Sequence, residues 1–357
     1  MELEQFRPRP MLVAKQTFVS QPRFPVIDAH NHLMEPFGGG WDQKPLGELL
    51  DLLDQAGVGM YVDLDGGWGE EVLNAHLEQF KAGAPERFKV FGGVDWSKWP
   101  ELGDHFPDWA AGRLRLQKER GAEGLKVWKG FGLQVRDHHG TLVPVDDPRL
   151  ETLWETAGEA GLPVLIHVAD PAAFFEPLDA TNERWEELHA HPDWHFPAPS
   201  YPTFHSILKG LANLVARHPL TVFIGAHVGC CAENLSWVGD LLERCPNFHV
   251  DISARLGELG RQPYTARRFF LKYADRILFG SDFGPDLESY QCYYRFLETD
   301  DEYFNYNPGD IPLQGRWHVC GLYLPDDVLA KVYYRNAERL FGGSIHHQPL
   351  SGAGIGQ

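Results

Sequence analysis

From Val26 onward, short runs of apolar and β-branched residues alternate with longer amphipathic segments rich in Leu, Ala and Glu. The short runs are typical of buried strands, and the longer segments repeat their apolar residues every three to four positions, as amphipathic helices do. The predicted strands span 26–31, 57–64, 88–95, 122–128, 163–168, 220–227, 248–252 and 276–282. The predicted helices follow them in turn, at 46–56, 69–82, 108–120, 149–160, 204–217, 232–244, 263–273 and 325–341.

Eight strand–helix alternations predict an α/β fold of the (β/α)8 TIM-barrel type. Such a barrel needs about 250 residues, and this chain has 357. We assign the surplus to an N-terminal arm, two insertions and a C-terminal tail around a barrel domain at 25–342. The arm spans 1–24, the insertions 171–203 and 285–324, and the tail 343–357. Both insertions follow a predicted strand and are rich in Trp, Tyr, Phe and Pro, so we expect lids on the C-terminal face of the barrel.

The composition narrows the classes of partner. An apolar content of 43% fits a globular protein with a substantial core, and 32 basic against 50 acidic residues argue against nucleic acid and anionic membranes. No apolar stretch approaches the ~18 residues of a membrane span. Five cysteines, an odd number, do not resemble a disulfide framework. We therefore expect a cytoplasmic protein that acts on a small molecule. A homodimer is common for such barrels, although nothing in the sequence shows an interface.

Polar residues stand where the predicted strands end. In Asp28-Ala29-His30-Asn31-His32, alternation places both histidines on one strand face, about 7 Å apart. The other strand-end residues are Lys126, His167, His227 and Asp282. One such histidine is usually a hydrogen-bonded core residue, but converging imidazoles and a carboxylate at one rim predict a cation site. Asp28 lies further from the rim, so we expect it to orient His30 or the barrel floor.

The ordered motifs resemble those of the amidohydrolase superfamily, in particular the branch that includes aminocarboxymuconate-semialdehyde decarboxylase. The matching pieces are Ile27-Asp28-Ala29-His30-Asn31-His32, Gly124-Leu125-Lys126, Leu165-Ile166-His167, Gly225-Ala226-His227-Val228-Gly229, Leu278-Phe279-Gly280-Ser281-Asp282 and Asn336-Ala337-Glu338-Arg339-Leu340-Phe341. The resemblance implies a divalent metal, zinc above all, held by His30, His32, His167 and Asp282. It also implies that Asp282 accepts a proton from the activated water, and that His227 orients or deprotonates this water.

Lys126 bears on the reaction class and on the number of metals. In binuclear members of the superfamily a lysine at this place is carbamylated and bridges two metals, and His227 would then hold the second. Mononuclear members often keep the lysine, and the decarboxylases generally lack it. We therefore predict a hydrolase that uses a metal-bound water on a C–N or C–O bond of a small polar substrate, for which a carboxylate is one option. A non-oxidative decarboxylase of a conjugated or aromatic acid is the alternative. Lys126 could instead bind substrate, or Lys129 could be the functional lysine.

Four further residues follow predicted strands and are candidates for substrate binding: Arg255, Trp68, Trp96 and Arg136. An arginine can bind a carboxylate through two hydrogen bonds, although a surface salt bridge is the equal alternative for Arg255. Two other histidine pairs, His138-His139 and His346-His347, lie outside the strand ends and are not counted as ligands.

Overall fold

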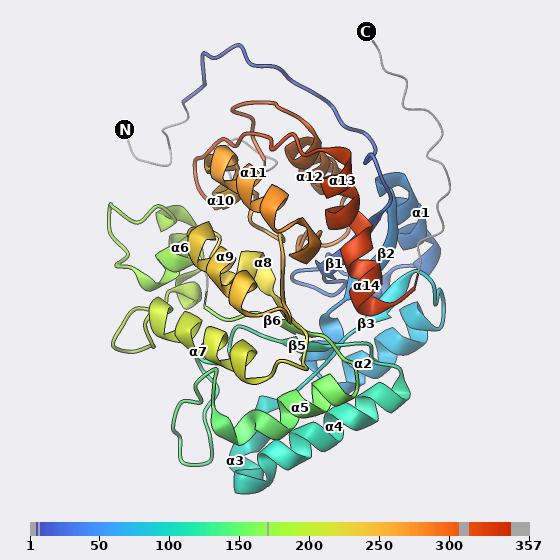
Figure 1. Ribbon diagram of the computed structural model, residues 1–357, viewed down its shortest axis with the longest axis vertical. Helices are drawn as coiled ribbons and strands as arrows, with labels where there is room; N and C mark the ends of the chain where they lie inside the picture. Colours follow the sequence, from blue (N-terminus) through green and yellow to red (C-terminus); the bar gives the residue numbers. More distant parts are fainter. Residues whose placement is uncertain (1–4, 6–7, 170, 307–313, 344–357) are drawn as a thin grey trace.

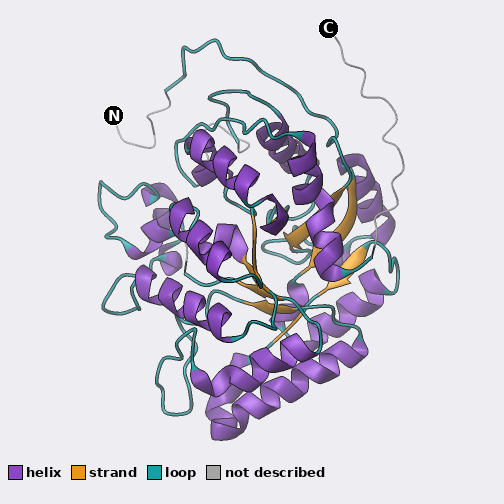
Figure 2. Ribbon diagram, in the orientation of Figure 1, coloured by secondary structure: helices purple, strands orange, loops and turns teal. Residues whose placement is uncertain are grey.

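The computed structural model describes residues 5, 8–169, 171–306 and 314–343. Its strands lie at the centre and its helices surround them (Figures 1 and 2). The strands are β1 (Val26–Asn31), β2 (Val58–Asp63), β3 (Phe88–Val90), β4 (Gly92–Gly93), β5 (Leu125–Val127), β6 (Val164–Ile166), β7 (Phe223–Gly225), β8 (Phe248–Asp251) and β9 (Ile277–Leu278). All neighbouring pairs are parallel, in the orders β1-β2-β3 and β4-β5-β6-β7-β8-β9.

Backbone hydrogen bonds connect the two sheets at both of their seams. Phe91 separates β3 from β4, and its N–H donates to the carbonyl of Asp63 in β2 (2.9 Å). On the opposite side, Ala29 N–H donates to Phe279 O (2.9 Å) and Asp282 N–H donates to His30 O (3.0 Å). With β3 and β4 counted as one interrupted strand, the order runs around a ring of eight, which confirms the predicted α/β fold.

The helices fill the intervals between the strands, as the amphipathic segments predict. They are α1 (Leu46–Ala56), α2 (Glu70–His76), α3 (Trp99–Leu102), α4 (Phe106–Arg120), α5 (Glu151–Glu159), α6 (Trp185–Ala190), α7 (Phe204–Arg217), α8 (Ala226–Cys230), α9 (Leu235–Arg244), α10 (Leu256–Arg261), α11 (Pro263–Lys272), α12 (Leu287–Glu298), α13 (Asp326–Ala330) and α14 (Asn336–Phe341). None of the described helices is long and apolar enough to cross a membrane.

Local sequence signals explain where several helices begin and end. The side chains of Asn234 and Asp286 accept hydrogen bonds from backbone N–H groups in the first turns of α9 and α12. Gly57 ends α1 in a left-handed conformation (φ 74°), which a residue with a side chain rarely adopts.

Two of the strands that end earlier than the sequence pattern predicts are followed by left-handed backbone. The predicted strand 220–227 stops at Gly225, and α8 is a left-handed turn in which His227 and Val228 have φ values of 56° and 60°. The predicted strand 276–282 stops at Leu278, and Asp282 also has a positive φ of 57°. Apolar periodicity does not register such turns. The left-handed residues include His227 after β7 and Asp282 after β9, which are both predicted site residues.

The N-terminal arm runs along the outside of the helices, as the blue trace in Figure 1 shows, and it contacts α12 and α13. Thr17 donates two hydrogen bonds to Asp301, from its N–H (2.6 Å) and its hydroxyl (2.7 Å). The first insertion contains α6, and the second begins with α12, whose Tyr294 hydroxyl donates to Ala56 O at the end of α1 (2.7 Å). The predicted domain boundaries and the lids stay predictions, and the predicted tail lies outside the described residues except for Gly343.

Candidate metal centre

Three predicted metal ligands come together at the end of β1. The Nε2 atom of His32 lies 3.3 Å from Asp282 Oδ1, and the Nε2 atom of His30 lies 3.6 Å from the same oxygen. His30 and His32 are almost completely buried, and the side chain of Asp282 is 19% exposed. Gly280 makes the approach possible, because a Cβ there would lie 2.9 Å from Cβ of His30. These three residues form one of the groups in the described chain that could hold a metal ion.

His227 and His167 extend this group. The left-handed turn after β7 directs His227 inward, so that its Nε2 lies 3.7 Å from Asp282 Oδ2. The N–H of His227 donates to Asp251 Oδ1 (3.0 Å), which holds the turn in place. The His167 ring follows β6 and stands edge-on to the His227 ring, with centroids 4.4 Å apart. The structure therefore places His167 beside His227, while His30 and His32 lie closest to Asp282.

Each of the three innermost histidines has a partner for its outer ring nitrogen. Nδ1 of His30 lies 2.9 Å from Asp251 Oδ2, and Nδ1 of His32 lies 2.7 Å from Asp65 Oδ1. Nδ1 of His227 lies 2.9 Å from the carbonyl of Ser253. Since carboxylate and carbonyl oxygens only accept, these contacts place a proton on Nδ1 and turn Nε2, the other ring nitrogen, towards the centre.

This donor set fits a divalent ion. Metal-ligating histidines usually donate their other N–H to a carboxylate or a carbonyl, as all three do here. Ligand atoms around a tetrahedral zinc ion with bonds of about 2.0–2.1 Å stand about 3.3 Å apart. The Nε2–oxygen separations of 3.3–3.7 Å are close to this value and longer than an ordinary hydrogen bond. The centre therefore has the chemistry of a metal site.

The charges at the centre favour an ionised carboxylate. Burial raises the pKa of Asp282, but His30 and His32 outweigh burial and hold this pKa well below its ordinary value. Burial lowers the pKa of His32, but the nearby carboxylates of Asp282 and Asp65 outweigh burial and raise the pKa to about 9. Without a metal, His32 therefore carries a proton at neutral pH, and a divalent ion that binds its Nε2 would displace this proton.

Lys126 in β5 also points into this centre. Its Nζ lies 3.1 Å from His30 Nε2, and the side chain is 1% exposed. Burial lowers the pKa of Lys126 to about 8, although Asp282 and Asp251 act in the opposite direction. The other candidate lysine, Lys129, is directed away, with its Nζ 5.2–5.5 Å from the ring centroids of Phe174, Trp194 and Phe196 in the first insertion.

A column of aromatic rings stands against the metal centre. Trp128 stacks on His32 (centroids 5.1 Å, 24°) and on Trp68 (3.9 Å, 29°). The ring of Phe37 is parallel to that of Trp68 (3°), with centroids 6.5 Å apart. Trp68 is 50% exposed and Phe37 is 43% exposed, so both present apolar ring surface to solvent. Lys126 Nζ lies 4.8 Å from the Trp128 ring centroid, which sets a cation beside this column.

The other three predicted substrate residues have different surroundings from Trp68. Arg255 is 5% exposed and lies among buried charges, where it helps to lower the pKa of Glu258, so the surface salt bridge is wrong as an alternative. Trp96 stacks on Phe131 (4.7 Å, 16°). Arg136 is exposed and donates to Gly140 O (2.9 Å), and none of its contacts in the described chain reaches the metal centre.

Neither the strand pattern nor the family motifs predicted a role for Asp65, Asp251 and Trp128. Asp251 ends β8 and Asp65 follows β2, so both carry the strand-end signal that pointed to the histidines. Asp28 is completely buried and accepts hydrogen bonds from Tyr290 Oη (2.7 Å) and Ser281 Oγ (2.8 Å). Its Oδ1 also accepts the N–H of His30 (3.3 Å), which agrees with the expected place beneath the metal centre.

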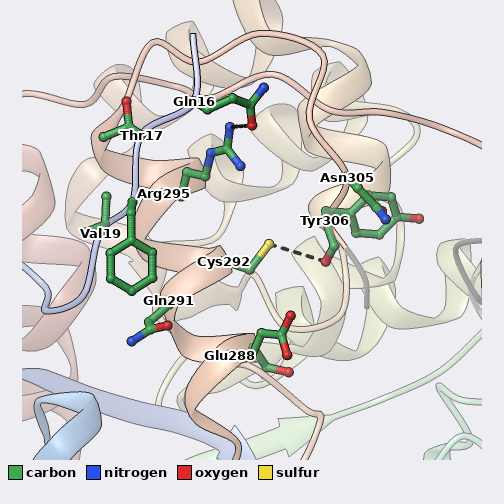
Figure 3. A pocket seen from close by; sticks show the side chains of 11 residues that line it. Gln16, Thr17, Val19, Glu288, Gln291, Cys292, Arg295, Asn305 and Tyr306 are labelled. Atoms are coloured by element: carbon green, nitrogen blue, oxygen red, sulfur yellow. Dashed lines mark hydrogen bonds between the residues drawn. The ribbon is translucent and has the colours of Figure 1, made fainter. Parts of the chain in front are cut away.

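A separate cavity of 480 Å³ lies between the N-terminal arm and α12 (Figure 3). Its walls include Phe18, Cys292, Arg295 and Tyr306, and they include none of the residues of the metal centre. The arm and α12 thus enclose a space that is distinct from the barrel mouth.

Comparison with known proteins places the chain in a family. The family model described as amidohydrolase matches residues 27–343. No curated protein sequence matches the chain. Similar solved structures include 2,6-dihydroxybenzoate decarboxylase from Rhizobium (18% identity, TM-score 0.56, covering 89% of this chain and 98% of that one). They also include 5-carboxyvanillate decarboxylase from Sphingomonas paucimobilis (15% identity, TM-score 0.52, covering 90% of this chain and 100% of that one). A third is dihydroxybenzoic acid decarboxylase from Polaromonas sp. JS666 with bound manganese and 2-nitroresorcinol (18%, 0.54, 89% and 97%).

At these identities the solved structures share the fold, the TIM barrel, with this chain. The family model extends from the second residue of β1 to the last described residue, and it includes every residue of the metal centre. The chain belongs to the amidohydrolase family.

Proposed function

We propose that the protein is a metal-dependent, non-oxidative decarboxylase of a small aromatic carboxylic acid. The observation that carries this proposal is the column of Trp128, Trp68 and Phe37 beside the metal centre. A planar apolar ring can stack on the exposed faces of Trp68 and Phe37. Lys126 supplies the positive charge that a carboxylate or a phenolate needs at the buried end.

The proposed reaction replaces the carboxylate group on the aromatic ring by a hydrogen atom. The ring carbon that bears the carboxylate receives a proton, its bond to the carboxyl carbon breaks, and carbon dioxide leaves. We assign the transfer of that proton to Asp282 and His227, whose Oδ2 and Nε2 atoms lie 3.7 Å apart at the centre. A cation bound there would act as a Lewis acid and polarise a substrate oxygen. The aromatic column orients the ring and excludes water from the reacting carbon.

The solved structures support the same reading, since three of the similar proteins are described as decarboxylases of aromatic acids. For the metal we propose zinc, which suits a set of histidines and one carboxylate. Manganese is the second candidate, because it is bound in the Polaromonas protein. The proposed partner is a small molecule, and neither nucleic acid nor a membrane enters the proposal.

Hydrolysis of a C–N or C–O bond is the second candidate function. Lys126 favours it, because the decarboxylases of this superfamily generally lack a lysine at that place, and because Nζ lies 3.1 Å from a predicted ligand nitrogen. In that reaction Asp282 would accept a proton from water, with His227 beside it.

One experiment separates the two functions. The protein, loaded with zinc or with manganese, is incubated with dihydroxybenzoates and carboxyvanillates, and in parallel with lactones and amides of similar size. Release of carbon dioxide together with the decarboxylated phenol supports the proposal. Release of an acid or an amine without carbon dioxide overturns it in favour of hydrolysis.

A further inference from the structure

Behind His32 the structure contains a second carboxylate–histidine pair that is joined to the first. Nδ1 of His76, the last residue of α2, lies 2.6 Å from Asp63 Oδ2 at the end of β2. The other oxygen of Asp63 accepts the backbone N–H of Asp65 (3.0 Å). Asp65 in turn holds Nδ1 of His32 at 2.7 Å. A continuous path of three hydrogen bonds therefore leads from α2 to a candidate metal ligand.

The middle of this path determines the direction of the Asp65 carboxylate. Asp63 accepts the N–H of the residue two positions later, which fixes the turn that leaves β2. With the turn fixed, Asp65 Oδ1 reaches His32, and Oδ2 accepts the N–H groups of Leu33 (2.7 Å) and Met34 (2.8 Å). Asp65 thus ties the loop after β1 to the loop after β2, and Asp63 keeps it in the conformation that does so.

The hydrogen bond between His76 and Asp63 is buried, and this is why the loss of His76 should matter. Asp63 is 0% exposed and His76 is 3% exposed, so water cannot replace the hydrogen bond between them. Without the imidazole, a buried carboxylate oxygen would lose its partner, and Asp63 would gain freedom to rotate away from the Asp65 N–H. His30 is held through Asp251, whose Oδ1 accepts the backbone N–H groups of His227 and Ser253 (both 3.0 Å), as Asp65 Oδ2 accepts those of Leu33 and Met34.

We propose that His76 and Asp63 are positioning residues of the metal centre: they hold the Asp65 carboxylate against His32 and so fix the direction of its ligand nitrogen. The inference rests on the metal centre of the proposed function and not on the reaction class. Removal of a group that orients a metal ligand commonly weakens metal binding by about 10- to 100-fold, and His76 and Asp63 act through such a group, Asp65.

The test is the affinity of the purified full chain for zinc, measured by competition with a chromophoric chelator. His76→Phe removes the donor and keeps an aromatic ring against Phe80, which His76 now meets edge-on at 5.0 Å. We expect zinc to bind about 10- to 100-fold more weakly to this variant. His76→Asn, whose amide can donate from the place of Nδ1, should restore the affinity to within a few-fold of the unmodified protein.

Two further variants control for stability. His218→Phe changes another buried histidine, after α7, and should leave the zinc affinity unchanged whatever it does to the melting temperature. Asp63→Ala removes the acceptor of the Asp65 N–H and should weaken zinc binding as His76→Phe does. The double variant should then add little, because both changes break one path.

Zinc affinity that is unchanged in folded His76→Phe or folded Asp63→Ala overturns the inference. Equal weakening in His76→Phe and His76→Asn also overturns it, because the hydrogen bond would then not be the cause. If the unmodified chain binds no zinc, or keeps it without His30 and His32, the metal centre itself fails, and this result is distinct from a failure of the positioning residues.

Discussion

The ammonium nitrogen of Lys126 lies 3.1 Å from Nε2 of His30, the ring nitrogen that faces the candidate metal centre. A lysine here is surrounded by protein, and burial lowers its pKa to about 8. The Lys126 nitrogen lies between the ligand nitrogen of His30 and the ring of Trp128, where the aromatic column meets the metal centre. Lys126 can serve substrate binding or a second metal, and these two possibilities make different predictions.

Replacement of Lys126 by methionine should reduce kcat/KM and leave the metal content unchanged. A hydrogen bond to a charged substrate group is worth about 1.5–3 kcal/mol, which corresponds to a reduction of about 10- to 100-fold. Steady-state kinetics and elemental analysis of Lys126→Met measure both quantities. Loss of one metal equivalent would instead identify Lys126 as a bridging ligand. A larger effect of Lys129→Met would make Lys129, now among the rings of the first insertion, the functional lysine.

Replacement of both His30 and His32 by alanine should abolish metal binding. The two Nε2 atoms lie 3.6 Å and 3.3 Å from Asp282 Oδ1, and alanine offers no ligand. Elemental analysis should find less than a tenth of the metal content of the unmodified chain. The matched control is His138→Ala with His139→Ala, a histidine pair that lies outside the centre and should keep the metal. Stoichiometric zinc in the first double variant would show that the site is misassigned.

Periodicity predicted the barrel and the innermost histidines, because both depend on the chain's own strand pattern. His30 and His32 are two residues apart on one strand, so their common direction follows from β geometry. Asp65 and Asp251 contact the histidines from other strands of the barrel. The sequence alone does not indicate which carboxylate lies against which histidine ring. Trp96 and Arg136 also follow strands, but they lie in the irregular connections beyond them. In such segments the spacing of residues along the sequence does not determine where a side chain points.

Asp282→Asn should remove turnover while the fold remains. Asp282 adopts a left-handed conformation (φ 57°), which asparagine tolerates as well as aspartate does. The amide cannot carry the proton that either proposed reaction requires, so we expect kcat to fall by at least about 100-fold. The melting temperature and circular dichroism of the variant serve as the control for folding. A rate close to that of the unmodified protein would exclude Asp282 as the proton carrier.

Trp68→Ala should raise KM for an aromatic acid more than it lowers kcat. Trp68 is half-exposed and offers a stacking surface, and loss of such a ring contact costs about 0.5–1.5 kcal/mol, or about 2- to 10-fold. Trp237→Ala on α9 is the matched control, because it removes another partly buried tryptophan from an outer helix. Equal kinetic constants for Trp68→Ala and the unmodified enzyme would exclude the aromatic column as the substrate surface.

His249 in β8 should limit the stability of the protein in acid. Burial, together with Arg276 and Arg339, lowers its pKa to about 3, and its Nδ1 is buried without a hydrogen-bond partner. In the unfolded chain a histidine has its ordinary pKa of about 6.5. Above that pH neither state binds the proton, and below it only the unfolded state does. Between pH 6.5 and about 3, folding therefore loses about 1.4 kcal/mol per pH unit through this residue.

Since leucine cannot bind a proton, His249→Leu should remove this loss and unfold at a lower pH than the unmodified protein. Acid titrations followed by circular dichroism give the two midpoints. His205→Leu, an exposed histidine on α7, controls for the general effect of replacing a histidine and should leave the midpoint where it is. If both variants unfold at the pH of the unmodified chain, the acid limit lies at other groups, such as the carboxylates of the metal centre that must be protonated as the pH falls.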